Sequence, residues 1–407
     1  MNRAAFGSLW LFVFVIPWEE VARFPYAGSL GRVVGLAACL VGVLYVLIRG
    51  RVRPLGWCHV FVLLFVLWGA VGLAWSVDLT ASGQRIGTYA QLGLFAWLIW
   101  ELAWSRDRQL ALLQAYVLGA WVLASSTTYN RLTDESFFRD DARFVALGYN
   151  PNDLALTLVL GLPLAWYLAV SGQRTRLAWL NWLYLPLGIT AVLLTASRGA
   201  FLATTPALLI VPWTLSRLRL RTRVALGVVA LACVVSVSSV VPEESWRRLE
   251  STRTDISEGY LGGRGSIWKA GVALFVQHPL AGVGAGTFAT AVEPLTHRPE
   301  ASHQTFLSVL VEQGVIGFAL FVGILVSAFL PVRRFPAPER KLWIVMLLTL
   351  CVGLMPANWD YRKPLWFLVG VLAAWAATGS GSRSMARAAP QLAAGASPKA
   401  DGREVAR

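Results

Sequence analysis

Charged residues are scarce in this chain: Asp, Glu, Lys and Arg together make up 14% of it, against roughly 25% in a soluble domain. Hydrophobic residues make up 56% and come in blocks of about 17–22, separated by short polar segments, which is typical of bilayer-spanning helices. A soluble core could not bury so many uninterrupted apolar stretches. The composition therefore excludes an ordinary soluble domain and predicts an all-α membrane protein with many spans.

Cysteine and histidine are also scarce, with four of each. No two cysteines form a C-x-x-C pair, and no histidines show H-E-x-x-H spacing, which argues against a disulfide framework or a metal-activated hydrolase. The acidic pair Glu19-Glu20 could mimic the metal-binding motif of some glycosyltransferases, or could be an interfacial polar cap. We expect no metal and no cofactor.

Positive charge exceeds negative charge, with a formal net charge of +14. The excess lies in short arginine-rich loops, as expected for cytoplasmic loops under the positive-inside rule, so no nucleic-acid partner is predicted. These loops are residues 49–53, 105–108, 174–176, 217–223 and 333–341.

About twelve spans are predicted from the ~20-residue length that a bilayer requires. They cover residues 4–18, 28–48, 57–77, 86–104, 109–128, 153–171, 177–196, 198–216, 224–241, 303–330, 342–356 and 364–378. The first reads as a signal anchor. As one helix, residues 183–215 would measure about 50 Å, so we expect a hairpin turn at residues 197–199, on the outer side.

Residues 1–378 form the predicted membrane domain, in which residues 242–302 make a long periplasmic loop with short helices. Residues 379–407 are rich in Ala, Gly, Ser and Pro and predict a disordered cytoplasmic tail. Within the loop, the glycine run 282–286 resembles a dinucleotide-binding fingerprint, but no strand–helix unit surrounds it. A tight re-entrant turn is the better interpretation.

Arg198, Arg264 and His303 are all expected near headgroup level on the outer side of the membrane. Arginine suits two-pronged contacts to phosphate, and histidine can accept a proton at ordinary pH. Each residue also has a structural interpretation. Arg198 could be a snorkelling anchor, Arg264 could pair with Asp255 or Glu258, and His303 could be a contact at a helix N-terminus.

At these residues the chain resembles the O-antigen ligase and O-antigen polymerase superfamily. The resemblance covers roughly residues 143–318, and it rests on order and topology because each motif is short. Where the family commonly has Asn after the histidine, this chain has Gln304. The matching segments are residues 148–152, 195–199, 263–268, 278–288, 302–307 and 312–317.

The resemblance implies a GT-C-like membrane glycosyltransferase of the bacterial inner membrane, with its active site facing the periplasm. Its donor would be a glycan on undecaprenyl pyrophosphate and its acceptor lipid A–core oligosaccharide, with no metal and inversion at the anomeric centre. His303 would be the catalytic base, and Arg198 and Arg264 would stabilise the leaving pyrophosphate. Further substrate contacts are implied for Arg143, Asn152, Gly263, Gly265 and Gln304.

Three other functions stay open. An O-antigen polymerase would use a second lipid-linked glycan as acceptor, and a protein O-oligosaccharyltransferase would use a protein, although this chain lacks the large C-terminal region of that branch. A solute transporter is disfavoured because the spans have few of the acidic residues that proton-coupled carriers keep at membrane depth.

Overall fold

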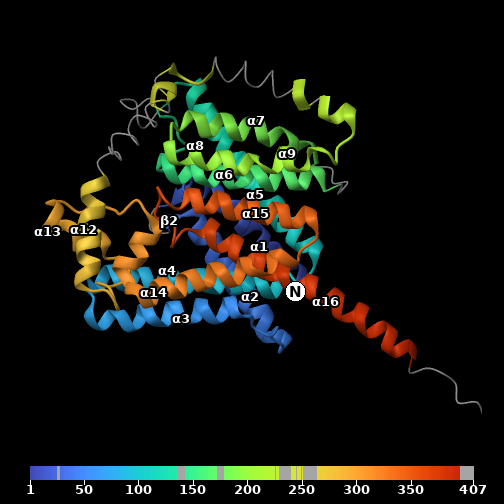
Figure 1. Cartoon of the computed structure of the whole chain (residues 1–407), viewed down its shortest axis with the longest axis horizontal. Helices are drawn as coiled ribbons and strands as arrows, with labels where there is room; N and C mark the ends of the chain where they lie inside the picture. Colours follow the sequence, from blue (N-terminus) through green and yellow to red (C-terminus); the bar gives the residue numbers. More distant parts are fainter. Residues whose placement is uncertain are drawn as a thin grey trace, which may run out of the picture.

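The computed structural model describes residues 1–24, 28–135, 143–171, 178–224, 226–228, 240–243, 245–248, 250 and 264–394, with side chains up to residue 378. Helices dominate this part of the chain, and most of the long ones run side by side (Figure 1). A two-residue hairpin, β1 (Arg23–Phe24) with β2 (Gly28–Ser29), is antiparallel, with Arg23 opposite Ser29.

The described residues up to Val170 form six α-helices. Their bounds, with two short 3-10 segments, are α1 (Asn2–Val15), η1 (Ile16–Trp18), α2 (Leu30–Arg49), α3 (Trp57–Val71), η2 (Gly72–Trp75), α4 (Leu79–Leu102), α5 (Arg106–Leu132) and α6 (Pro151–Val170). The later described elements are α7 (Ala178–Leu194), α8 (Arg198–Leu208), α9 (Ile210–Leu215), α12 (Arg264–Gln277), α13 (Phe288–Thr296), α14 (Thr305–Phe329), η4 (Leu330–Arg334), α15 (Ala337–Gly353) and α16 (Lys363–Ala394).

Five helical segments of the described chain are long and apolar enough to cross a membrane, and two shorter apolar helices accompany them. The five are Leu30–Arg49, Trp57–Trp75, Arg106–Leu132, Pro151–Val170 and Thr305–Arg334; the shorter two are Ala178–Leu194 and Lys363–Thr378. The protein is therefore a helical, multi-pass membrane protein. The count of twelve stays a prediction, because most of the expected ninth span (224–241) lies outside the described residues.

The outer surface of the bundle is apolar, whereas its centre is densely packed. On α2, Leu36, Leu40 and Leu47 are 56%, 71% and 71% exposed, a pattern that suits contact with lipid rather than with water. In contrast, 78% of the apolar window of α6 is buried by neighbouring helices. The rings of Tyr116 and Phe367 stack in this core, with centroids 5.2 Å apart.

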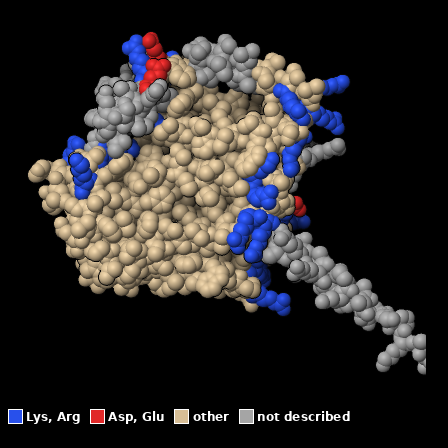
Figure 2. All heavy atoms as spheres, viewed as in Figure 1, with Lys and Arg blue, Asp and Glu red and all other residues tan. Residues whose placement is uncertain are grey.

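The two ends of the bundle differ in charge. Lys and Arg side chains gather at the end from which α16 extends (Figure 2), and this basic end carries Arg49, Arg106, Arg217 and Arg333. At the opposite end, α12 and α13 lie across the ends of the long helices (Figure 1). This loop end also carries Arg198, where α7 turns into α8. The predicted turn is therefore confirmed, but it spans residues 195–197 rather than 197–199, and its outer side stays a prediction.

Several helix boundaries differ from the sequence-based expectation by a few residues, and two of these differences matter for the site and the tail. The helix after residue 302 begins at Thr305 rather than His303, because His303 has a positive φ that a helix cannot contain. Helix α16 continues through the expected tail to Ala394, where alanine, arginine and methionine favour helix, and residues 395–407 lie outside the described chain.

Candidate functional site

Arg198 begins α8 at the loop end, directly after a tight turn. Ala196 in this turn has a φ of 46°, a conformation that non-glycine residues rarely adopt and that surrounding contacts must hold in place. The Thr195 hydroxyl donates to the Val192 carbonyl (2.6 Å) and accepts from the Ser197 N–H (3.2 Å). These bonds fix the start of α8 and with it the backbone of Arg198.

Arg143 and Asn152, two predicted substrate ligands, hold this turn from the side of α6. Arg143 Nε donates to the Thr195 carbonyl (2.9 Å), and Arg143 Nη2 donates to Asn152 Oδ1 (3.1 Å). The Ser197 hydroxyl donates to the same Asn152 oxygen (2.8 Å). Arg143 is 9% exposed, so the structure gives both residues a supporting role beneath Arg198, and substrate contact by either stays a prediction.

His303 lies in a short loop just before α14, with a φ of 48°. Asn358 Oδ1 accepts from the Ser302 hydroxyl (2.7 Å) and from the Gln304 N–H (2.9 Å), and therefore binds the loop on both sides of His303. From α12, Trp268 Nε1 donates to the Ser302 carbonyl (2.8 Å). The histidine thus stands on a backbone segment that two other parts of the chain hold in a strained conformation.

Gln304, a third predicted substrate ligand, is the N-cap of α14. Its Oε1 accepts from the Leu307 N–H, and its Nε2 lies 3.7 Å from Met355 Sδ. The next residue, Thr305, donates its hydroxyl proton to the Ala357 carbonyl (2.6 Å). The longer side chain in place of the family's asparagine therefore has a local role at the start of the helix, which the sequence comparison did not indicate.

Arg264 is the first residue of α12, and its Nη1 donates to the Pro356 carbonyl (3.3 Å). Pro356 also packs directly on Gly199, where any Cβ would overlap the proline ring. The neighbourhoods of Arg198 and Arg264 therefore meet at one proline. Gly265 faces open space, with no atom within 4 Å of where its Cβ would be, and Gly263 lies outside the described residues.

The three predicted catalytic residues influence one another electrostatically. Burial and the nearby Arg198 charge both lower the pKa of Arg264. Burial also lowers the pKa of His303, and the Arg264 charge lowers it further, against the opposing effects of Glu300 and Asp153. The pKa of His303 therefore lies below its ordinary value of ~6.5, so its imidazole is neutral at ordinary pH and can accept a proton.

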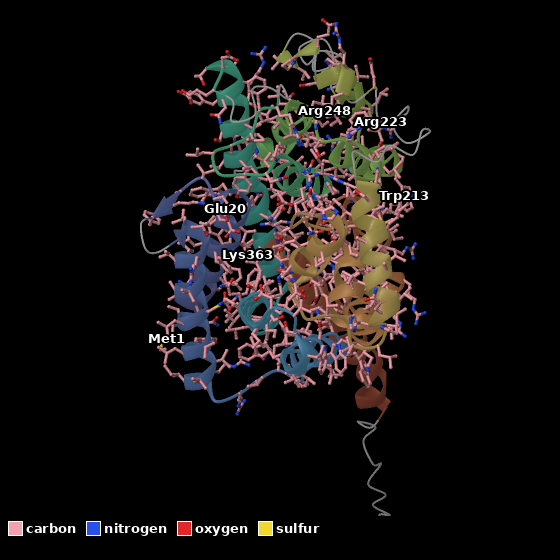
Figure 3. The ribbon with its side chains drawn as sticks, turned by 90° about the vertical axis from the view of Figure 1, so that its left-hand side faces the viewer. Met1, Glu20, Trp213, Arg223, Arg248 and Lys363 are labelled. Atoms are coloured by element: carbon pink, nitrogen blue, oxygen red, sulfur yellow. The ribbon has the colours of Figure 1, made fainter. Side chains whose placement is uncertain are left out.

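A cavity of about 200 Å³ lies at the same end of the bundle, between the end of α1, the start of α6 and the α15–α16 loop (residues 354–362). Ion pairs line its wall: Glu19 with Lys363 (2.5 Å), Glu20 with Arg23 (2.6 Å), and Asp153 with Arg362. Figure 3 looks onto this end of the molecule and shows Glu20 and Lys363 on neighbouring segments. Glu19 and Glu20 thus each have a cationic partner in the cavity wall.

Asp153 connects the cavity to His303. Its carboxylate pairs with Arg362, accepts from Trp359 Nε1 (3.0 Å) and lies close enough to His303 to affect its pKa. The Nε of Arg362 is buried and has no hydrogen-bond partner in the described part of the chain. A polar ligand in this cavity would therefore meet both donors and acceptors.

The sequence prediction missed Asp153, Asn358, Trp359 and Arg362 as members of this site. A signal was present, because residues 358–363 read Asn-Trp-Asp-Tyr-Arg-Lys between two apolar spans. The length of this polar run exceeds what a simple turn between helices requires. What the sequence did not indicate was the partners, which lie 54 to 209 residues away.

The glycine run forms a tight turn, as predicted. Gly284 has a φ of 113°, and a Cβ there would overlap Ser76. The turn packs on α14, where the Gly284 N–H donates to the Glu312 carbonyl (2.8 Å) and the Gly286 N–H donates to the Glu312 carboxylate (2.6 Å). Arg85 lies 3.9 Å from the same carboxylate. The run is thus a structural turn and not a dinucleotide site.

Fold and site together define a multi-pass helical membrane protein with two arginines and a neutral histidine at one end of its bundle. The family described as O-antigen ligase matches residues 183–322, a segment that contains Arg198, Arg264 and His303. This match supports the chain as a member of the O-antigen ligase family, which comprises membrane glycosyltransferase-like ligases and polymerases. No curated protein sequence matches the chain.

Proposed function

We propose that this protein transfers a finished glycan from undecaprenyl pyrophosphate to lipid A–core oligosaccharide, without a metal. The observation that carries the proposal is the convergence of Arg198, Arg264 and a neutral His303 at one end of the bundle, inside the segment that matches the O-antigen ligase family. A lipid-linked donor and acceptor both present their reactive groups at headgroup level, where a site at the end of the bundle can reach them.

The proposed reaction is a direct displacement at the anomeric carbon of the donor sugar. The acceptor hydroxyl oxygen forms the new glycosidic bond, and His303 removes its proton. The bond between the anomeric carbon and the pyrophosphate oxygen breaks, and undecaprenyl pyrophosphate leaves with the electron pair. Attack opposite the leaving group inverts the anomeric centre.

Two arginines suit the leaving group because its negative charge grows as that bond breaks. Donors fixed in advance in a poorly solvated site stabilise such charge without reorganisation, and a guanidinium binds phosphate oxygens with two parallel hydrogen bonds. Their mutual repulsion lowers the pKa of Arg264, and an anionic ligand between them would relieve it. The pair is thus better suited to a bound dianion than to an empty site.

The cavity at this end of the bundle is proposed to hold a sugar of the acceptor. A volume of about 200 Å³ corresponds to some six or seven water molecules at ~30 Å³ each, enough for one sugar ring. Sugar hydroxyls both donate and accept hydrogen bonds, which fits a wall of carboxylates beside guanidinium and ammonium groups. Asp153 lines the cavity and acts electrostatically on His303, so an acceptor sugar bound in the cavity would lie on the side of the site that faces the base.

A reconstituted assay tests this function. Purified protein in proteoliposomes is given a labelled lipid-linked glycan with EDTA present, and either lipid A–core, no acceptor, or an acceptor protein. We expect a product only with lipid A–core. Glycan lengthening without acceptor would identify a polymerase, and labelled protein would identify a protein glycosyltransferase. Loss of transfer in EDTA, restored by Mg²⁺, would assign charge stabilisation to a metal instead of the arginines.

A further inference from the structure

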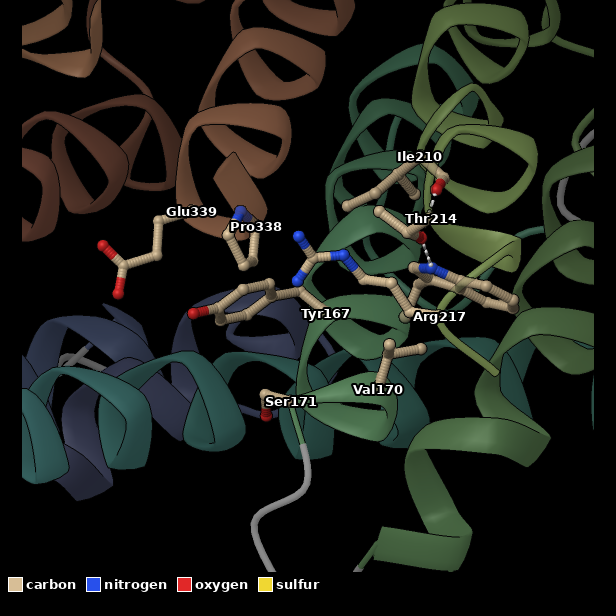
Figure 4. Close-up of a pocket in the computed structure, with 9 residues that line it drawn as sticks. Tyr167, Val170, Ser171, Ile210, Thr214, Arg217, Pro338 and Glu339 are labelled. Atoms are coloured by element: carbon tan, nitrogen blue, oxygen red, sulfur yellow. Dashed lines mark hydrogen bonds between the residues drawn. The ribbon is translucent and has the colours of Figure 1, made fainter. Parts of the chain in front are cut away.

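A second pocket lies at the basic end, far from the proposed glycan site. It has a volume of about 200 Å³ and lies between α6, α9 and the start of α15. Figure 4 shows Arg217 extending across it toward Tyr167 and Pro338, with Thr214 and Ile210 on the wall from α9. Neither the family match nor the glycan-transfer proposal assigns a role to this pocket.

Two hydrogen-bond donors are left open in this pocket. Within the described chain, the Arg217 guanidinium has no hydrogen-bond or ion-pair partner, and the Tyr167 hydroxyl has no hydrogen bond. The charge of Glu339, a carboxylate on the pocket wall, is paired with another cation, because its Oε2 accepts from Arg106 Nη2 and from Trp375 Nε1, each at 3.2 Å. The pocket is therefore suited to an anion.

The remaining hydroxyls of the pocket are used within the protein. The Thr214 hydroxyl accepts from Trp166 Nε1 (2.7 Å) and donates to the Ile210 carbonyl (2.6 Å), and the Ser171 hydroxyl donates to a backbone carbonyl (3.1 Å). In sequence, the segments that follow Ser171 and surround Arg217 (residues 172–177 and 216–223) contain six arginines and no Asp or Glu. Arg217 therefore lacks an acidic neighbour in sequence as well.

The surroundings favour a membrane lipid as the source of that anion. Val170 and Ile210 add apolar surface to the pocket, and the neighbouring Leu209 and Trp213 are 45% and 43% exposed on the outside of the bundle. An exposed tryptophan beside an arginine-rich loop is typical of the membrane interface. We propose that the pocket binds the phosphate headgroup of an anionic phospholipid, through Arg217 and Tyr167, in the leaflet at the basic end.

Lipid binding to the full-length protein in nanodiscs tests this proposal. Retention of phosphatidylglycerol over phosphatidylcholine is measured by native mass spectrometry for the wild type, Arg217→Gln and Tyr167→Phe. The matched control is Arg219→Gln, an arginine two residues away that does not line the pocket. We expect Arg217→Gln to weaken phosphatidylglycerol binding roughly tenfold or more, since a charged group donates those bonds, and Tyr167→Phe to weaken it less.

Equal loss in Arg217→Gln and Arg219→Gln would overturn the proposal, because the attraction would then belong to the whole basic end. Inorganic phosphate is the second probe. If millimolar phosphate displaces phosphatidylglycerol from the wild type, the pocket takes a soluble anion and the lipid assignment is wrong. Unchanged retention in phosphate, together with the selective effect of Arg217→Gln, supports it.

Discussion

Replacing Asn358 should separate the positioning of His303 from its chemistry. Asn358 Oδ1 accepts two hydrogen bonds, one from each residue that flanks the histidine. Asn358→Ala removes both, whereas Asn358→Asp keeps an oxygen that can accept them. Asn358 donates no hydrogen bond to the loop, so the change does not touch the proposed base itself.

The expected magnitude follows from these contacts. Each of the two lost hydrogen bonds contributes about 0.5–1.5 kcal/mol, so the pair contributes about 1–3 kcal/mol. The donors are not left without a partner, because the Ser302 hydroxyl still reaches the Gln304 carbonyl (3.0 Å) and the Gln304 N–H still reaches Ser302 Oγ (3.2 Å). The left-handed conformation of His303 itself costs about 1–3 kcal/mol, so the freed loop would relax away from it. A change of 1–3 kcal/mol corresponds to roughly 5–150-fold in a population. Asn358→Ala should therefore lower kcat by about that factor.

The aspartate variant has a second signature. Its carboxylate would lie near His303 and favour the protonated imidazole, which raises the histidine pKa. A base with a higher pKa is protonated at higher pH, so the acid limb of the pH–kcat profile should shift upward in Asn358→Asp. Near pH 8 this variant should transfer far better than Asn358→Ala.

The assay is initial-rate glycan transfer in proteoliposomes, with thermal stability measured in parallel. Asn181→Ala is the matched control, because Asn181 also makes two hydrogen bonds, with Gln114 in the bundle interior (3.0 and 2.9 Å). It should lower stability and leave kcat nearly unchanged. If Asn358→Ala transfers within twofold of the wild type, the loop does not need this anchor and the positioning argument is wrong.

Three further predictions concern the chemistry and its orientation. Arg198→Lys and Arg264→Lys should each lose about 10²–10³-fold in rate, because lysine keeps the charge without the planar two-pronged contact; normal transfer by Arg198→Lys would indicate an anchor only. Because the pKa of His303 is lowered, transfer should persist as the pH is lowered to ~6.5 and should decline only at lower pH. If kcat already falls while the pH is still being lowered toward ~7, His303 is not a neutral, partly buried base. A cysteine placed at Glu250 should react with an impermeant reagent from outside, and one at Arg219 should not. The reverse result would place the proposed glycan site on the cytoplasmic side of the membrane and contradict the proposal.

The sequence could predict those parts of the fold that follow from comparing the length of an apolar segment with the thickness of the bilayer. Residues 183–215 are too long for one span, and that argument placed the turn that now precedes Arg198. The same reasoning could not predict the φ of 46° at Ala196 or the Arg143–Asn152 support beneath it, because these depend on contacts between helices. Motif order could likewise nominate Arg143, Asn152 and Gln304, but not distinguish ligands from supports.

The α15–α16 loop contains site residues that the sequence did not predict at all. Asn358 and Trp359 lie outside the segment that resembles the family, and their partners are 54 and 206 residues away. Their role depends on α6, α14 and α16 beginning or ending at the same height in the bundle. Such convergence follows from packing, which hydropathy does not encode.

The most direct test of the central claim is the transfer rate of His303→Ala beside the wild type. Both proteins are reconstituted at equal membrane levels with lipid-linked glycan and lipid A–core in metal-free buffer. Loss of a positioned base predicts a drop of about 10²–10⁴-fold, with the protein still folded, because His303 is only partly buried and lies in the loop before α14 rather than in the core. Transfer by His303→Ala at near the wild-type rate would contradict the account, and the acceptor would then be activated by another group.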